Sequence, residues 1–202
     1  MQLKEYAERK IRDVKKWNAS SWKDKKMAQF LDNDSVVLDI GCWPAILSQK
    51  FGIQNYFGVD YNEYFVENGI KNWLQVSQLD LSTNDLPFED DTFDLIYCSH
   101  VIEHLETDRQ IHLFFEIQRV LKNDGVLFMF APTPYHWYFW DDPTHKRPVT
   151  HKSLEQLAKD TWLHVFESKY SFVRGFSNNL QRWLRLPPLR WFLWEVYIIA
   201  RK

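Results

Sequence analysis

The chain has 202 residues, 45 % of them hydrophobic, and a formal net charge of −2, which together indicate one globular domain with a sizeable core. So small a net charge offers no general attraction to nucleic acid, and no nucleic-acid partner is expected. The charged N-terminus lacks the apolar core of a signal peptide, and no apolar run approaches the ~18 residues of a membrane span. A cytoplasmic protein is therefore predicted. Cys42 and Cys98 have neither C-x-x-C spacing nor a secretory context, so both are expected to be reduced.

Residues 1–33 are predicted to form N-terminal helices. The first, over 3–17, has apolar residues at three- and four-residue intervals, which is typical of an amphipathic helix. A second is expected at about 21–31, because Ser21 can cap it and Asp24 lies at the capping-box distance. The inward face of this second helix is predicted to hold Trp22, Met27, Phe30 and Leu31.

From residue 34 onward, strand and helix patterns alternate. Short apolar runs typical of buried strands lie at 36–40, 55–59, 73–76, 94–98 and 126–130. Helices are expected at about 44–50 and 62–71, and in a segment that Thr107 caps and Gly125 ends. The inward side chains of that last helix are predicted to be Ile111, Phe114, Phe115, Ile117, Val120 and Leu121. This alternation predicts an α/β fold with a doubly wound, mostly parallel sheet, helices on both faces, and ligands at the carboxyl ends of the strands.

The turn after the first strand, within VVLDIGCWPAILSQKFG (36–52), begins like a nucleotide-binding loop. Such a turn presents backbone N–H groups and a helix N-terminus to a ligand. Asp60 lies 19 residues after Gly41, where a carboxylate can accept both hydroxyls of a ribose. A dinucleotide is disfavoured, because its pyrophosphate needs glycine where Trp43 and Ile46 stand. S-adenosylmethionine also contains adenosine but carries no phosphate, so the same residues are a weaker objection to it.

Five segments resemble, in order and at the usual spacings, the motifs of class I S-adenosylmethionine-dependent methyltransferases. They are VVLDIGCWPA, YFGVDYN, QLDL, LPFEDDTFDLIYCSHVIEHL and EIQRVLKNDGVLFMFAPTP. The type 11 subgroup, which modifies small molecules and glycans, is the most similar. The resemblance is close over about 34–135 and looser toward the C-terminus. It implies a single Rossmann-like methyltransferase domain over 1–202 with a seven-stranded sheet, in which 34–131 form the cofactor-binding core and 153–202 complete the sheet.

The resemblance also implies which residues bind S-adenosylmethionine. Asp39 and Gly41 would shape the methionine side of the pocket, and Asp60 would bind the ribose hydroxyls. Asp80 and the Leu81 backbone would hold the adenine edge. The other residues expected in the pocket are Cys42, Trp43, Tyr61 and Ser99.

Residues 132–152 form a long segment without a helical or strand period, and it is rich in aromatic side chains. Long irregular segments in compact domains are often lids or binding loops, so a lid or acceptor loop is expected here. The alternative is that the aromatic side chains only cover an edge of the sheet. If the acceptor is a hydroxyl, a base should take its proton, and a histidine suits that task. His145 is the first candidate and His100 the second.

The predicted function is S-adenosylmethionine-dependent methyl transfer to an oxygen or nitrogen of a small metabolite, sugar or lipid-linked precursor. One alternative arises because Trp43 and Ala45 stand where the family pattern has glycine. A chain with an impaired cofactor loop would instead be a non-catalytic interaction protein of the same fold.

A more remote alternative is a zinc hydrolase. His100, Glu103 and His104 fit the H-x-x-E-H pattern, in which two histidines one helical turn apart bind zinc beside a general-base glutamate. A third ligand would be needed, and the downstream candidates are Glu116, Glu155 and Glu167. Because the motif follows an apolar strand where the methyltransferase pattern expects it, we favour methyl transfer and expect no metal.

Residues 182–194, RWLRLPPLRWFLW, could form an aromatic, basic surface for weak membrane-surface contact. Pro187 and Pro188 break any long amphipathic helix there. A strand-turn-strand completion of the sheet is therefore the simpler prediction.

Overall fold

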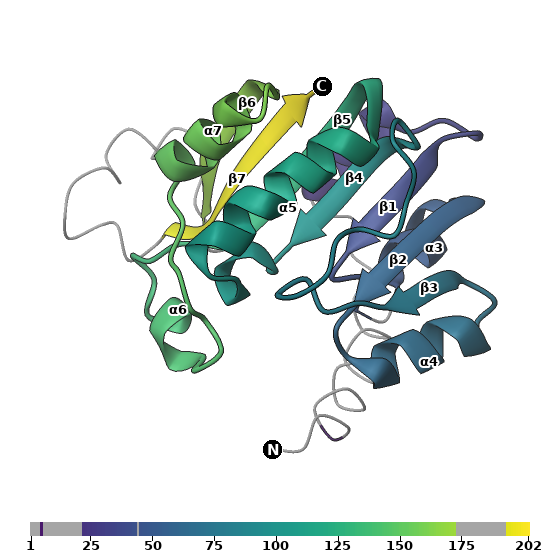
Figure 1. Ribbon diagram of the computed structural model, residues 1–202, viewed down its shortest axis with the longest axis horizontal. Coiled ribbons are helices and arrows are strands. Elements are labelled where there is room, and N and C mark those ends of the chain that lie inside the picture. The colour runs from purple at the N-terminus through teal and green to yellow at the C-terminus, as the bar shows by residue number, and fades with distance from the viewer. Residues whose placement is uncertain (1–4, 6–21, 44, 173–192) are drawn as a thin grey trace.

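The computed structural model describes residues 5, 22–43, 45–172 and 193–202, and these form a seven-stranded sheet with helices on both faces (Figure 1). The strands are β1 (Val36–Ile40), β2 (Asn55–Asp60), β3 (Gln75–Gln78), β4 (Phe93–Ser99), β5 (Leu121–Pro132), β6 (His164–Phe172) and β7 (Leu193–Arg201). Their order in the sheet is β3-β2-β1-β4-β5-β7-β6. The first five are parallel, and β7 runs antiparallel to both β5 and β6. The predicted doubly wound, mostly parallel α/β fold is confirmed.

Helices connect the strands and cover the sheet. They are α2 (Trp22–Met27), α3 (Ile46–Phe51), α4 (Glu63–Lys71), α5 (Thr107–Val120), α6 (Trp137–Asp141) and α7 (His151–Asp160), with 3-10 turns η1 (Ala28–Phe30) and η2 (Ile102–His104). Successive side chains of a strand point to opposite faces. On one face, Leu38 of β1 shares a core with Phe114 of α5 and Leu154 of α7. On the other face, Val37 shares a second core with Met27 of α2, and partly buried side chains of α3 pack against it.

Several predicted boundaries were wrong. The strand expected at 73–76 is β3, two residues later, because Trp73 lies in a turn with φ 61° and is 95 % exposed. The predicted Thr107 cap is instead the first residue of α5, and no side chain caps that end. The helix ends at Val120 and not at Gly125, which lies inside β5. A Cβ at Gly125 would lie 2.8 Å from the carbonyl oxygen of Lys122, so this glycine permits a tight backbone path within the strand.

Three side chains predicted to face inward are more than 40 % exposed. Ile111 and Phe115 of α5 are 41 % and 42 % exposed, although Phe114 and Ile117 are fully buried. Trp22 of α2 is 43 % exposed, whereas Met27 is buried as predicted. The predicted apolar faces were too wide, because an α-helix of 3.6 residues per turn buries one stripe only.

The segment 132–152 is not wholly irregular, since it contains the short helix α6 and the first residues of α7. Helix α7 was not predicted. A capping box begins it: the Ser153 backbone N–H donates to the Thr150 hydroxyl at 3.2 Å, and the Thr150 backbone N–H donates to the Ser153 hydroxyl at 2.7 Å.

The predicted helix over 3–17, Ser21, Pro44 and residues 182–192 lie outside the described residues. Cys42 and Cys98 are buried, free thiols. Within the described part of the chain, none of the helices has the length and apolar character needed to cross a bilayer.

Candidate active site

The carboxyl ends of three neighbouring parallel strands carry residues predicted to bind the cofactor. Asp39 is the fourth residue of β1, Asp60 the last of β2 and Ser99 the last of β4. Strand β1 lies between the other two, and Asp39 pairs with Gly58 of β2 and Tyr97 of β4. Since the strands are parallel, their carboxyl ends meet at one edge of the sheet (Figure 1). The fold therefore brings these three side chains to one place.

Hydrogen bonds to β2 hold the loop after β1. The backbone N–H groups of Gly41 and Cys42 both donate to the carbonyl oxygen of Val59, at 2.8 and 3.0 Å. The next N–H group, that of Trp43, donates to Oδ2 of Asp60 at 2.9 Å. The side chain expected to bind the ribose thus also anchors the loop.

The loop keeps a glycine-type backbone without all of its glycines. Gly41, Trp43 and Ala45 have φ values of 71°, 48° and 53°, all in the left-handed region. This region costs a non-glycine residue about 1–2 kcal/mol. The Trp43 ring packs edge-on against Phe65 of α4, with ring centroids 6.3 Å apart, so the large side chain is directed toward that helix. Trp43 and Ala45 therefore adopt backbone conformations that glycine favours, and the Trp43 ring points toward α4.

Two acidic side chains lie under this loop. Asp39 is 4 % exposed, and its Oδ2 accepts a hydrogen bond from the Tyr56 hydroxyl at 2.8 Å. Burial raises the pKa of Asp39 to about 7, the Tyr56 bond opposes this rise, and the charge of Asp60 adds to it. Burial also raises the pKa of Asp60, against the N–H bonds from Asn62 and Trp43. Together they make a negative region suited to hydroxyl donors and to a positively charged group.

The residues predicted to bind adenine lie after β3. Oδ1 of Asp80 accepts from the backbone N–H and the hydroxyl of Ser82, at 2.9 and 2.6 Å, and these bonds lower the pKa of Asp80. The carbonyl oxygen of Leu81 accepts from Nε of Arg109 on α5 at 2.9 Å. Tyr61, after β2, is 60 % exposed. The polar groups of Asp80 and Leu81 are thus held in fixed positions by neighbours.

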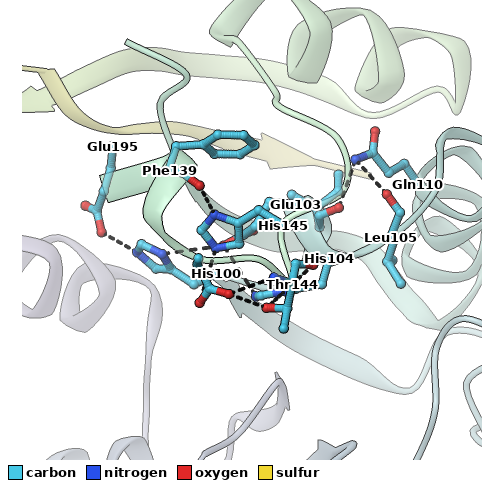
Figure 2. Close-up of polar contacts among 11 residues, drawn as sticks. His100, Glu103, His104, Leu105, Gln110, Phe139, Thr144, His145 and Glu195 are labelled. Carbon is cyan, nitrogen blue, oxygen red and sulfur yellow. Dashed lines mark hydrogen bonds and ion pairs between the residues drawn. The ribbon is translucent and has the colours of Figure 1, made fainter. Parts of the chain in front are cut away.

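The chain turns sharply after β4, at His100, which has φ 58°. Its backbone N–H donates to the carbonyl oxygen of Phe130, and its ring Nε2 lies 2.8 Å from Oε1 of Glu195 on β7 (Figure 2). Burial lowers the pKa of His100, but the bond and charge of Glu195 and the charge of Glu103 outweigh that effect, so the pKa is raised overall. Its side chain is 33 % exposed, so His100 is both anchored and accessible.

Glu103 links this turn to the segment predicted as a lid. Its carbonyl oxygen accepts from the backbone N–H groups of Lys146 and Arg147, at 2.8 and 3.1 Å. Its carboxylate Oε1 lies 3.9 Å from Nε2 of His145 and 4.0 Å from Nε2 of His104 (Figure 2). His100 lies on the same carboxylate, with Nδ1 3.6 Å from Oε1. Both predicted catalytic histidines therefore meet at Glu103.

The Glu103 side chain is completely buried. Burial raises its pKa to about 7, and the charge of His100 opposes the rise. Within the described residues, neither carboxylate oxygen has a hydrogen-bond partner. Such a group is costly unless a proton or a cation neutralises it.

The structure does not support the zinc-hydrolase hypothesis. That pattern needs both histidines on one α-helix, but His100 lies in the turn after β4 and His104 closes the single 3-10 turn η2. Of the predicted third ligands, Glu116 is paired with Arg119 and Glu167 with Lys26, both at 2.8 Å, and Glu155 lies on α7.

Three members of the cluster around Glu103, which consists of His100, Glu103, His104, His145 and Glu195, were not predicted to be functional on their own account. Glu103, like His104, was considered only within the hydrolase pattern. Glu195 is 4 % exposed and lies within the mainly apolar strand β7. An acidic residue inside an apolar strand is the sequence signal that could have identified it. His145, which lies beside His104, belongs to a segment distant in the sequence. No rule of sequence spacing predicts that these two residues meet.

Comparison with known proteins finds a match to a protein family. Residues 38–129 match the family model of the methyltransferase domain. The uncharacterized methyltransferase YcgJ of Bacillus subtilis is 31 % identical over 167 residues, which are 73 % of this chain and 59 % of YcgJ. The chain spans less than two thirds of the length of the curated relatives that it matches.

Solved structures share the fold. An S-adenosylmethionine-dependent methyltransferase from Archaeoglobus fulgidus superimposes with a TM-score of 0.67 at 24 % identity, covering 89 % of this chain and 91 % of the other. A methyltransferase solved with the Trm112 activator of Haloferax volcanii gives a TM-score of 0.75 at 18 % identity, covering 99 % and 97 %. Residues 38–129 thus resemble the methyltransferase domain, and the fold is the one found in solved S-adenosylmethionine-dependent methyltransferases.

Proposed function

We propose that the chain transfers a methyl group from S-adenosylmethionine to an oxygen or nitrogen atom of a small metabolite, a sugar or a lipid-linked precursor. The observation that carries this proposal is the 2.9 Å hydrogen bond from the Trp43 backbone N–H to Asp60. It holds the cofactor loop against β2 in a glycine-type conformation although Trp43 has replaced glycine. The match of residues 38–129 to the methyltransferase domain supports the same activity.

The residues present fit the cofactor. Oδ2 of Asp60 accepts one N–H from Trp43, and Oδ1 accepts one from Asn62 at 2.8 Å. Each carboxylate oxygen has a second lone pair, so Asp60 can also accept two ribose hydroxyls. Asp39 adds negative charge on the methionine side. S-adenosylmethionine, when bound, supplies an electrophilic methyl group on a sulfonium, and the carbon–sulfur bond breaks as the acceptor atom forms its bond to carbon.

The cluster around Glu103 lies beside the cofactor loop and would hold the acceptor. A Cβ at Gly41 would be 2.3 Å from Cγ2 of Val101, so the loop and the turn after β4 are in direct contact. His145 has its Nδ1 2.7 Å from the carbonyl oxygen of Phe139, which leaves Nε2 as the nitrogen that could take a proton from an acceptor hydroxyl. His100 is the second candidate for that role.

The test uses methyl-labelled S-adenosylmethionine and a panel of hydroxyl and amine acceptors. We expect the His145→Ala variant to lose about 100-fold or more in turnover, with unchanged affinity for S-adenosylhomocysteine. His112→Ala is the matched control, since His112 lies on the surface of α5 in a pair with Asp85. Normal turnover in His145→Ala would remove that residue from the mechanism. Failure of the wild type to bind S-adenosylhomocysteine would overturn the proposal and favour the non-catalytic alternative.

A further inference from the structure

Three side chains with metal-binding donor atoms converge beside the cofactor loop. One ligand atom each of Glu103, His104 and His145 lies within 4.8 Å of the other two. The first two belong to η2, and the third follows α6, so tertiary structure brings them together. They lie next to Val101, which contacts Gly41.

Both imidazoles are oriented as metal ligands are. Nδ1 of His104 lies 3.2 Å from the carbonyl oxygen of Thr144, and Nδ1 of His145 lies 2.7 Å from that of Phe139 (Figure 2). A carbonyl can only accept, so each Nδ1 carries the hydrogen, and each neutral ring directs the lone pair of Nε2 toward Glu103. A backbone carbonyl on the far ring nitrogen is the usual support of a metal-bound histidine.

The carboxylate completes the set of donors. Glu103 is fully buried, and within the described residues its oxygens receive no hydrogen bond. Two nitrogen lone pairs therefore face a buried carboxylate that accepts no hydrogen bond from the described residues. Nδ1 of His100 lies at ion-pair distance, 3.6 Å, from the same Oε1, and a cation held by the three donors would give that carboxylate a direct partner. Among buried groups of the described chain, the hydroxyl of Ser168 is the other one without a partner, and it lies on β6, away from this cluster.

We propose that Glu103, His104 and His145 bind a divalent first-row transition-metal ion, in the range from Mn²⁺ to Zn²⁺, and that its open coordination positions take the hydroxyl oxygen of the methyl acceptor. Two imidazoles and one carboxylate are a known donor set for such ions. The assignment of the hydroxyl rests on the proposed methyl transfer, whereas metal binding does not.

The distances fit a site that tightens on loading. Ligands about 2.0–2.1 Å from a tetrahedral ion are roughly 3.3 Å apart. Oε1 of Glu103 is 3.9 Å from Nε2 of His145 and 4.0 Å from Nε2 of His104, and the ligand atoms of the two histidines lie within 4.8 Å of each other, so the three donors must move closer together to hold an ion.

The ion would change the role of His145 from proton acceptor to ligand. A bound metal ion lowers the pKa of a coordinated hydroxyl. The hydroxyl proton then passes to solvent, the oxygen forms the new bond to the methyl carbon, and the electron pair of the broken carbon–sulfur bond stays on sulfur. An acceptor that carries a hydroxyl is selected over an amine, because a metal-bound alkoxide oxygen keeps lone pairs for the attack on the methyl carbon, whereas an amine nitrogen uses its only lone pair to bind the ion.

The test measures metal binding directly on tag-free protein stripped with a chelator. Zn²⁺ and Mn²⁺ are titrated by calorimetry, and Co²⁺ is followed by its visible absorption. The wild type should bind one ion, and Glu103→Gln, His104→Ala and His145→Ala should each weaken binding on the order of 100-fold or more. His112→Ala is the control and should bind as the wild type does.

Glu103→Gln keeps the size of the side chain, and its unfolding midpoint, measured alongside, checks that it folds. No binding by the wild type at millimolar metal, or unchanged binding by both Glu103→Gln and His145→Ala, would overturn the metal site. S-adenosylhomocysteine is titrated into the same samples. Cofactor binding without metal binding refutes only the metal inference, whereas metal binding without cofactor binding refutes the proposed methyl transfer and leaves the metal site.

Discussion

The carboxylate of Glu195, on the last strand, lies 2.8 Å from Nε2 of His100, at the turn after β4, although 95 residues separate them in the chain. Nζ of Lys23 lies 2.6 Å from the same oxygen, and the Ser171 hydroxyl donates to the other oxygen at 3.1 Å. Burial would raise the pKa of Glu195, but the bond from His100 and the charges of Lys23 and His100 hold it at about 2. Glu195 therefore fixes the His100 ring at the edge of the site and is a positioning residue.

Glu195→Gln keeps the shape of this side chain and removes its charge. We expect kcat to fall by about 10- to 100-fold, because the ring of His100 loses its charged partner, while the affinity for S-adenosylhomocysteine stays the same. Steady-state kinetics and calorimetry measure the two effects. Ser171→Ala, which loses one bond to Glu195, should keep its kcat. A wild-type kcat in Glu195→Gln would show that His100 does not need this anchor.

Comparing Gly41 with Gly52 separates the energetic cost of a left-handed backbone conformation from the cost of a steric contact. Both have left-handed φ values, 71° and 63°, but a Cβ at Gly52 would meet nothing within 4 Å, whereas one at Gly41 would lie 2.3 Å from Cγ2 of Val101. Gly52→Ala should therefore lower the free energy of unfolding by about 1–2 kcal/mol, and Gly41→Ala by roughly 1–3 kcal/mol more. Urea unfolding measures both.

A double-mutant cycle tests whether the contact with Val101 causes the larger effect of Gly41→Ala. Adding Val101→Ala to Gly41→Ala removes the methyl group that the new Cβ would meet, so most of the extra loss should be recovered. Simple addition of the two single effects would show that loop and turn are not in contact.

Asp39 makes the stability of the cofactor-free protein depend on pH. Its pKa is about 7 in the folded protein and about 3.8 in the unfolded chain, so the folded state binds the proton more tightly. The resulting stability is fully present below about pH 4 and is lost as the pH rises through 7. Asp39→Asn has no such loss and should be roughly 2–4 kcal/mol more stable than the wild type at pH 8.

That advantage of Asp39→Asn should shrink steadily between pH 7 and pH 5. Denaturant unfolding at several pH values measures it, with Asp34→Asn, a change at an exposed site, as the control. Equal stabilities of Asp39→Asn and wild type at pH 8 would mean that the charge of the buried Asp39 does not destabilise the folded protein.

The sheet could be predicted because its strands carry their own local signals. Apolar runs that end in Gly41, Asp60 or Ser99 mark both a buried strand and the residue at its carboxyl end. The ends of α5 could not be predicted in this way. Gly125 looks like a helix terminator in sequence, but the close contact with the Lys122 carbonyl, which explains the glycine, exists only once β5 is formed.

The candidate site likewise has one part that local sequence signals predict and one part that depends on long-range contacts. The residues predicted to bind the cofactor lie near one another in the chain or at the ends of neighbouring strands, so motif order alone predicts that they share one edge of the sheet. The cluster at Glu103 depends on residues 40 or more positions apart, such as His104 and Thr144, and on β7 lying next to β5. Only the folded chain reveals that Nε2 of His145 lies 3.9 Å from a buried carboxylate.

The most direct test of the account is the thermal unfolding midpoint with and without S-adenosylhomocysteine, in the wild type and in Asp60→Ala. A ligand at ~100 times its dissociation constant adds about 2.7 kcal/mol. For a chain of this size the midpoint should rise by roughly 5–11 °C. We predict that rise in the wild type and its loss in Asp60→Ala, whose own ligand-free midpoint is the baseline. No rise in the wild type at millimolar ligand would contradict a working cofactor site at the loop that contains Trp43.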